Sequence, residues 1–104
     1  MSARKCTVAF TARAQNDLDD ILLYTRETWG KAQRSKYRAK LQHEFDQLAM
    51  FPHKGRARND ISNGLRSISI DHYLVYYRVG TNDLHMIHRI VHSKRDIIKE
   101  LDLE

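Results

Sequence analysis

Apolar residues recur at helical spacing early in the chain. They occupy positions i, i+4, i+7, i+8, i+11 and i+15 of one stripe, which are Ala14, Leu18, Ile21, Leu22, Thr25 and Trp29. Thr11 precedes the stripe and predicts an N-cap, because its hydroxyl can accept a hydrogen bond from a free backbone N–H of the first turn. Gly30 follows it and predicts the left-handed residue that ends a helix. We therefore expect a helix between Thr11 and Gly30, with Trp29 anchored in the core.

A second amphipathic stretch follows from about Lys31 to Phe51. Its apolar stripe is Tyr37, Leu41, Phe45 and Leu48, and basic residues occupy much of the remaining surface. Pro52 ends this helix, because the proline ring disfavours helical geometry in the residue before it. Since only Gly30 separates the two helices, they are predicted to form an antiparallel hairpin.

Short alternating or continuous apolar runs predict strands in the rest of the chain. The predicted strands are residues 5–10, 65–70, 73–79 and 84–91. The last of these is apolar on both faces, which is typical of a central strand covered on both sides. Residues 53–63 are predicted to form a polar loop, residues 80–83 a hairpin connection and residues 93–101 a final helix.

The predicted element order is β-α-α-β-β-β-α, without an internal repeat. It indicates an α+β fold, in which a largely antiparallel sheet packs against the N-terminal helical hairpin. A chain of 104 residues has the size of one domain, so residues 1–104 are assigned to a single domain.

Composition narrows the class of protein. Hydrophobic residues make up 41% of the chain and proline occurs once, so neither a disordered linker nor a fibrous repeat is expected. The longest apolar runs, such as residues 73–77, are far shorter than the roughly 18 residues of a membrane helix. No secretory signal is visible, and Cys6 has no second cysteine with which to form a disulfide. These features predict a protein of the reducing cytoplasm.

The net charge of +5 is spread unevenly. Residues 1–52 carry nine basic and six acidic side chains, residues 53–95 eight and three, and residues 96–104 one and four. A basic middle followed by an acidic tail suggests a positive surface for an anionic partner, although small basic domains without such a partner are also common.

Candidate chemistry among the histidines and the cysteine is weak. His85, His88 and His92 lie within eight residues, but on one strand His85 should point away from the other two, whereas a zinc site needs convergent ligands. Cys6 shows no sign of activation, and no glycine-rich phosphate loop is present. We therefore predict neither a metal site nor a catalytic thiol.

The basic residues of the second half are more informative, namely Arg56, Arg58, Arg66, Arg78, Arg89, Lys94 and Arg95. Arg66, Arg78 and Arg89 fall on three successive predicted strands and could converge on one sheet surface that grips phosphates or carboxylates. With Tyr73 or His92, such a surface could bind nucleic acid or cleave RNA. The structural alternative is that Arg78 or Arg89 pairs with a helix carboxylate, Asp17 or Asp20.

Short motifs in a fixed order run from residue 8 to residue 96. They are Ala14-x-x-Asp17-Leu18-x-x-Ile21-x-x-Tyr24-Thr25, Trp29-Gly30, Tyr37-x-x-x-Leu41, Phe45-x-x-Leu48-Ala49-x-x-Pro52-x-x-Gly55-Arg56, Gly64-Leu65-Arg66, Tyr76-Tyr77-Arg78 and Arg89-Ile90-Val91-His92-x-x-x-Asp96. No single motif is diagnostic, but together they resemble the ParE branch of the RelE/ParE toxin superfamily.

This resemblance implies the toxin of a bacterial type II toxin–antitoxin pair, acting in the cytoplasm. ParE-like toxins stall DNA gyrase with DNA cleaved and so block replication, and a ParD-like antitoxin with an acidic tail neutralises them. No cofactor is expected. The residues expected to bind the antitoxin or the target are Arg56, Arg66, Arg78, Arg89 and Arg95. A homodimer formed through the helical hairpin, within a toxin–antitoxin assembly, is a further expectation.

The rival within the superfamily is a RelE-like, ribosome-dependent mRNA endonuclease. Its catalytic groups would here be Arg66, Arg95 and His92. However, Tyr73 stands where that branch places a sheet arginine, and no tyrosine follows Tyr77. The nuclease is therefore the alternative rather than the first expectation.

Overall fold

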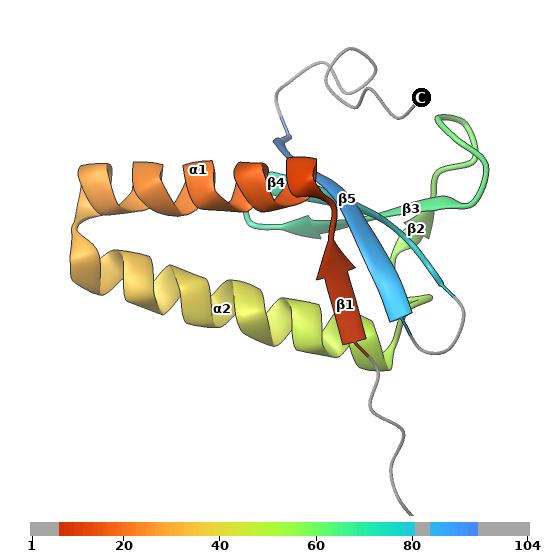
Figure 1. Cartoon of the computed structure of the whole chain (residues 1–104), viewed down its shortest axis with the longest axis horizontal. Coiled ribbons are helices and arrows are strands. Elements are labelled where there is room, and N and C mark those ends of the chain that lie inside the picture. The colour runs from red at the N-terminus through yellow and green to blue at the C-terminus, as the bar shows by residue number, and fades with distance from the viewer. Residues whose placement is uncertain (1–6, 81–83, 94–104) are drawn as a thin grey trace, which may run out of the picture.

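Two helices form the predicted hairpin (Figure 1). The computed structural model describes residues 7–80 and 84–93, with α1 at Ala12–Trp29 and α2 at Lys31–Met50. The Thr11 hydroxyl accepts a 3.1 Å hydrogen bond from the Ala14 N–H, which confirms the N-cap. Gly30 has φ +95° and donates its N–H to the Arg26 carbonyl at 2.8 Å, which confirms the helix end.

Five strands form one mixed sheet. They are β1 (Thr7–Phe10), β2 (Arg56–Ala57), β3 (Leu65–Ile70), β4 (Tyr73–Arg78) and β5 (Leu84–His92). Their order across the sheet is β1-β5-β4-β3-β2. Only the β1–β5 pairing is parallel, so the predicted largely antiparallel sheet is confirmed. The broad β5 ribbon crosses beneath the start of α1, next to β1 (Figure 1).

The sequence prediction differs from the structure at several boundaries. The segment predicted as loop 53–63 contains β2, a two-residue edge strand that forms because it pairs with Arg66 and Ser67 of β3. The predicted strands 73–79 and 84–91 end at Arg78 and His92 instead. Lys5, Cys6 and nearly all of the predicted helix 93–101 lie outside the described residues.

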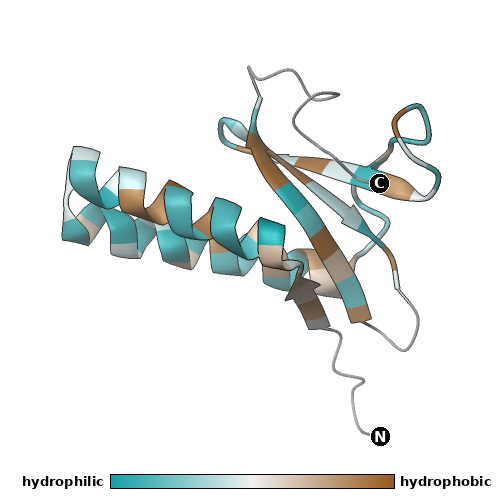
Figure 2. Ribbon diagram, turned by 45° about the horizontal axis from the view of Figure 1, so that its top comes forward, coloured by the Kyte–Doolittle hydropathy of each residue, from teal (hydrophilic) through white to brown (hydrophobic). Residues whose placement is uncertain are grey.

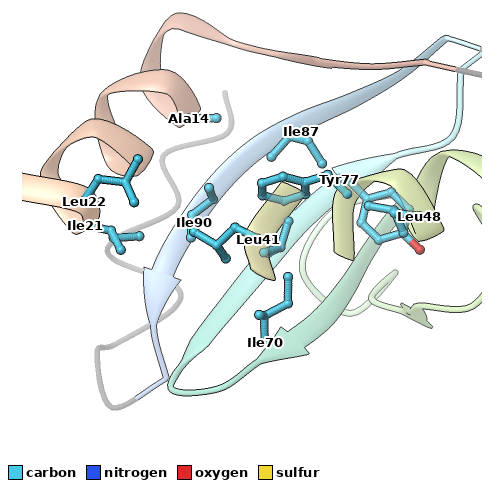
Figure 3. Packing of buried hydrophobic residues seen from close by; sticks show 11 residues of the cluster. Ala14, Ile21, Leu22, Leu41, Leu48, Ile70, Tyr77, Ile87 and Ile90 are labelled. Carbon is cyan, nitrogen blue, oxygen red and sulfur yellow. The ribbon is translucent and has the colours of Figure 1, made fainter. Parts of the chain in front are cut away.

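The main hydrophobic core lies between the hairpin and one face of the sheet (Figure 3). Its members come from both helices and three strands and include Ile21, Leu22, Leu41, Phe45, Leu48, Ile70, Val75, Tyr77, Ile87 and Ile90. Apolar residues along the strands alternate with polar ones, which Figure 2 shows as brown and teal bands. The face of the sheet that carries this core is here called the inner face.

The opposite face of the sheet, here called the outer face, carries a smaller cluster. Its buried residues are Leu65, Tyr76 and Val91, against which Ile61 and Leu74 pack. Because Ile61 belongs to the loop that precedes β3, this loop folds back onto the outer face.

A bulge in β5 changes which side chains face the core. Tyr76 pairs with Arg89 but Tyr77 pairs with Ile87, so His88 is an extra residue opposite β4. As a consequence, Ile87 and Ile90 both lie in the main core although they are three residues apart.

Trp29 departs from the predicted core stripe. It lies seven residues after Leu22, on the same side of α1, but its side chain is 70% exposed. The buried residues of α1 end at Thr25, and the hairpin extends beyond the sheet (Figure 1). The predicted anchoring role is therefore wrong, because no sheet lies beneath this end of the helix.

Within the described residues, no helix is both long and apolar enough to cross a membrane.

Candidate functional site

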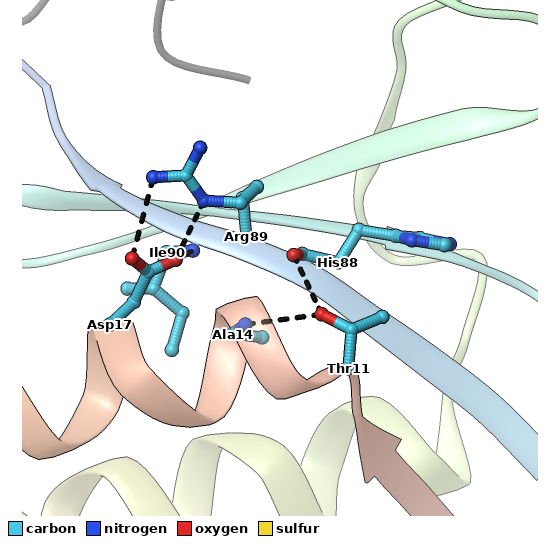
Figure 4. Close-up of polar contacts among 6 residues, drawn as sticks. All are labelled: Thr11, Ala14, Asp17, His88, Arg89 and Ile90. Atoms are coloured by element: carbon cyan, nitrogen blue, oxygen red, sulfur yellow. Dashed lines mark hydrogen bonds and ion pairs between the residues drawn. The ribbon is translucent and has the colours of Figure 1, made fainter. Parts of the chain in front are cut away.

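Arg89 forms a buried ion pair with Asp17 (Figure 4). Its Nε lies 2.8 Å from one carboxylate oxygen of Asp17 and its Nη2 lies 3.3 Å from the other. The side chains are 6% and 14% exposed. The structural alternative for this arginine is thus confirmed: Arg89 ties β5 to α1.

The same carboxylate completes the edge of β5. The pairing of β1 with β5 ends at Phe10 and Ile87. Beyond it, the Thr11 hydroxyl donates to the His88 carbonyl at 3.0 Å, and Asp17 accepts the Ile90 N–H at 3.0 Å (Figure 4). The start of α1 therefore continues the hydrogen bonding that the short strand β1 leaves unfinished.

Arg66 and Tyr77 hold the turn that follows α2. The Arg66 guanidinium donates to the carbonyls of His53 and Gly55, at 3.1 and 2.7 Å. The Tyr77 hydroxyl donates to the Pro52 carbonyl at 2.7 Å and accepts the Gly55 N–H at 3.0 Å. A Cβ on Gly55 would lie 2.3 Å from the Tyr77 oxygen, so this approach requires glycine.

Arg78 lies on the outer face and contacts the loop before β3. It donates to the Ser62 hydroxyl, and its Nε lies 3.4 Å from the Asn63 carbonyl. Its Nη1 lies 3.3 Å from Nε2 of His88. Because a guanidinium can only donate, His88 must accept here as a neutral ring. Burial, together with the Arg78 charge, lowers the pKa of His88 below its ordinary value of 6.5.

This contact predicts a pH dependence of stability. The unfolded chain binds a proton at His88 near pH 6.5 and the folded chain only at lower pH, so the free energy of unfolding falls as the pH drops below about 6.5. For one proton the slope is at most about 1.4 kcal/mol per pH unit.

We expect His88→Gln to remove this part of the dependence, because the amide oxygen can still accept from Arg78 but cannot titrate. The control His43→Gln changes an exposed residue of α2 and should keep the wild-type pH profile. Urea unfolding at pH 7.5 and 5.5 measures both; identical profiles for His88→Gln and wild type would contradict the assignment.

Arg58 and Arg56 are the other two arginines of the predicted basic set that the structure describes. Arg58 pairs with Asp60 at 3.1 Å, and its guanidinium carbon lies 6.0 Å from the centre of the Tyr76 ring. The hydrogen bond with Asp60 raises the pKa of Arg58 and lowers that of Asp60. Arg56, on β2, is exposed.

The predicted convergence of three arginines is only partly correct. Arg78 and Arg89 lie on the outer face, as the registers Leu65–Arg78 and Tyr76–Arg89 require. Arg66 pairs with Tyr77 and therefore lies on the inner face. Side chains alternate between the two faces along each strand. Which residues of neighbouring strands share a face therefore depends on the register between the strands, which the sequence alone does not give.

The candidate nuclease residues are not adjacent. Arg66 pairs with Tyr77, whereas His92 pairs with Tyr73, four residues away on β4. On strand geometry their backbones are separated by roughly 13 Å along the sheet and roughly 10 Å across it. Arg95 lies outside the described residues.

The orientation predicted for the histidines is wrong in one respect. His85 pairs with Val8 and His92 pairs with Tyr73, and both partners pack on the main core, so both histidines lie on the inner face. The bulge at His88 shifts the alternation between them. In the part of the chain that is described, no three His, Cys, Asp or Glu side chains are placed to hold a metal ion.

Known proteins share both this sequence pattern and this fold. Residues 8–97 match the model of a family described as "ParE toxin of type II toxin-antitoxin system, parDE". Toxin ParE1 of Mycobacterium tuberculosis (strain CDC 1551 / Oshkosh) is 33% identical over 88 residues, covering 85% of this chain and 90% of the relative. Toxin ParE of Escherichia coli is 30% identical over 91 residues, covering 88% of each.

A solved structure agrees at the level of the fold. It is described as the chromosomal ParDE TA system from P. aeruginosa, and it superposes with a TM-score of 0.72 at 19% identity. The superposition covers 88% of this chain and 100% of the other. With the family match spanning nearly the whole chain, we conclude that this protein belongs to the ParE toxin family of type II toxin–antitoxin systems.

Proposed function

We propose that this toxin binds DNA gyrase, stalls the enzyme with its DNA cleaved, and so blocks replication. The observation that carries the proposal is the match to the ParE family over residues 8–97. The toxin acts here as a protein-binding inhibitor and makes or breaks no covalent bond itself. Since gyrase acts on chromosomal DNA, the proposed compartment is the bacterial cytoplasm.

The proposed neutralising partner is a ParD-like antitoxin with an acidic segment. Among the cations expected to bind it, Arg56 is exposed and forms no ion pair or side-chain hydrogen bond with the residues described. Arg66, Arg78 and Arg89 all form hydrogen bonds within the fold. Arg56 is therefore our first candidate for a direct contact, and Arg95 remains a candidate from the sequence. Steering by such charges would accelerate association more than it tightens binding.

The alternative is a ribosome-dependent mRNA endonuclease that uses Arg66, Arg95 and His92. The separation of Arg66 from His92 favours the gyrase proposal, because acid–base catalysis needs its groups within hydrogen-bond reach of one substrate. The Arg66 guanidinium is moreover bound to two backbone carbonyls, which leaves it less able to bind a phosphate.

A homodimer formed through the hairpin stays a prediction. Light scattering of the toxin alone and with its antitoxin would measure it.

Two parallel reactions test the proposed function. In the first, toxin is added to gyrase, ATP and relaxed plasmid; in the second, it is added to a translation reaction whose mRNA is followed on a gel. We expect supercoiling to fall with toxin dose and to recover when an equimolar antitoxin is added, while the mRNA stays intact. Unaffected supercoiling together with cuts in phase with the codons would establish the nuclease instead.

A further inference from the structure

The outer end of the helical hairpin lies beyond the sheet (Figure 1). The last buried residue of α1 is Thr25, and the first fully buried residue of α2 is Leu41, with Tyr37 half-buried before it. We call residues 23–38 the hairpin tip. None of them except Thr25 is buried, so the tip contributes little to the core and its composition needs another explanation.

The tip is strongly basic. Residues 23–38 contain one acidic side chain, Glu27, and five basic ones, which are Arg26, Lys31, Arg34, Lys36 and Arg38. This segment alone therefore carries a charge of +4, compared with +5 for the whole chain. Lys40, just outside the tip, pairs with Asp71 at 2.6 Å, whereas the five basic residues of the tip form no ion pair with any residue in the described ranges.

Exposed aromatic side chains accompany these charges. Trp29 is 70% exposed, Tyr24 is 61% exposed and Leu23 is 50% exposed. An indole ring left in water forgoes a large apolar burial, so an exposed tryptophan in a segment rich in cations without ion pairs points to a surface that is covered on binding.

We propose that the hairpin tip binds a single strand of nucleic acid, with its cations on the phosphates and Trp29 stacked on a base. Lys31, Arg34 and Arg38 have the spacing i, i+3 and i+7, which places them along one side of α2. They span about 10 Å of helix axis. Each of these three cations can neutralise one phosphate of a flexible single strand, so about three phosphates are neutralised in all.

The features of the tip fit a nucleic acid better than an acidic peptide. Two common modes of peptide recognition use a free strand edge or an apolar groove, whereas the tip consists of helix ends and their turn. Aromatic rings that stack on bases and cations that track the backbone are the usual elements of single-strand binding.

Trp29 is the only tryptophan of the chain, so its fluorescence reports directly on the tip. The full chain is titrated with an oligothymidylate of about twelve nucleotides. We expect saturable quenching with a Kd between about 10⁻⁶ and 10⁻⁴ M, and a slope of log K against log salt near −2, since about three phosphates are neutralised.

Variants with matched charge test the location. The double variant Arg34→Gln/Arg38→Gln should weaken binding about ten-fold or more and reduce the slope of log K against log salt by about 1.4. The double variant Arg13→Gln/Lys54→Gln removes the same charge from exposed residues outside the tip and should change the affinity by less than about two-fold. Trp29→Leu, followed with a labelled oligonucleotide, should weaken binding at least about five-fold. Circular dichroism confirms that each variant is folded.

Several outcomes would overturn the proposal. The first is Trp29 quenching that does not saturate in this concentration range, and the second is an equal loss of affinity in the two charge-matched double variants. The third is tighter binding to a duplex than to the single strand. The fourth is equal quenching by poly-glutamate, which would indicate an acidic protein partner. A Trp29 emission that depends on protein concentration without oligonucleotide would show that a second copy covers the tip. None of these outcomes involves gyrase, so the proposed function is tested separately.

Discussion

Replacing Asp17 with alanine lowers the free energy of unfolding by about 3–5 kcal/mol, the range expected when one partner of a buried ion pair is removed. The Asp17 carboxylate accepts from the Arg89 side chain and from the Ile90 N–H. Without it, a guanidinium that is 6% exposed loses this counter-charge, and a backbone N–H of β5 loses its acceptor.

Urea unfolding measures this loss against a neighbouring control. Asp20→Ala, three residues along α1 and exposed, should change the free energy of unfolding by less than about 0.5 kcal/mol. A double-mutant cycle with Arg89→Met then isolates the coupling between the two side chains. Equal effects of Asp17→Ala and Asp20→Ala would contradict the structural role given to Asp17.

Replacing Leu48 with alanine should cost about 2–5 kcal/mol of the free energy of unfolding. Leu48 is 1% exposed and belongs to the core between α2 and the sheet (Figure 3). The substitution loses the burial of the side chain and leaves a cavity that the surrounding residues can only partly fill.

Leu23→Ala makes the same chemical change on α1, where the side chain is 50% exposed, and should cost less than about 1 kcal/mol. Thermal unfolding of both variants provides the measurement. A similar loss of stability in both would mean that α2 does not pack on the sheet as described.

The two helices and four of the five described strands could be predicted from periodicity and end signals. Thr11 and Gly30 mark the ends of α1 because capping is local and depends on residue type. Neither the strand β2 nor the bulge at His88 could be predicted in this way. A two-residue strand has no period, and a bulge exists only relative to its partner strand.

The candidate site was harder to predict because a charge count does not show partners. Arg89 and Asp17 are 72 residues apart in sequence, and Arg66 binds backbone carbonyls that no pattern marks. Residues 1–52 combine a neutral start, the basic tip and an acidic end of α2, so the net charge of this half conceals the tip.

Many residues of the motifs that are typical of the family stabilise the fold. Asp17 and Arg89 join helix to sheet, and Gly55 and Tyr77 fix the turn after α2. These residues therefore explain why the chain adopts this fold without naming its target. Contacts with the target have to come from surface residues, which the motifs leave largely unspecified.

The most direct test of whether the toxin stalls gyrase on cleaved DNA is the state of plasmid DNA after gyrase has turned over in the presence of the toxin. The reaction contains gyrase, ATP and supercoiled plasmid, and it is stopped with detergent and then protease, so that DNA held cleaved by stalled gyrase is released as linear molecules. We predict that linear DNA increases with toxin dose, disappears when antitoxin is added first, and is absent when gyrase is omitted. Plasmid that stays supercoiled at every toxin dose would contradict the proposed inhibition of gyrase.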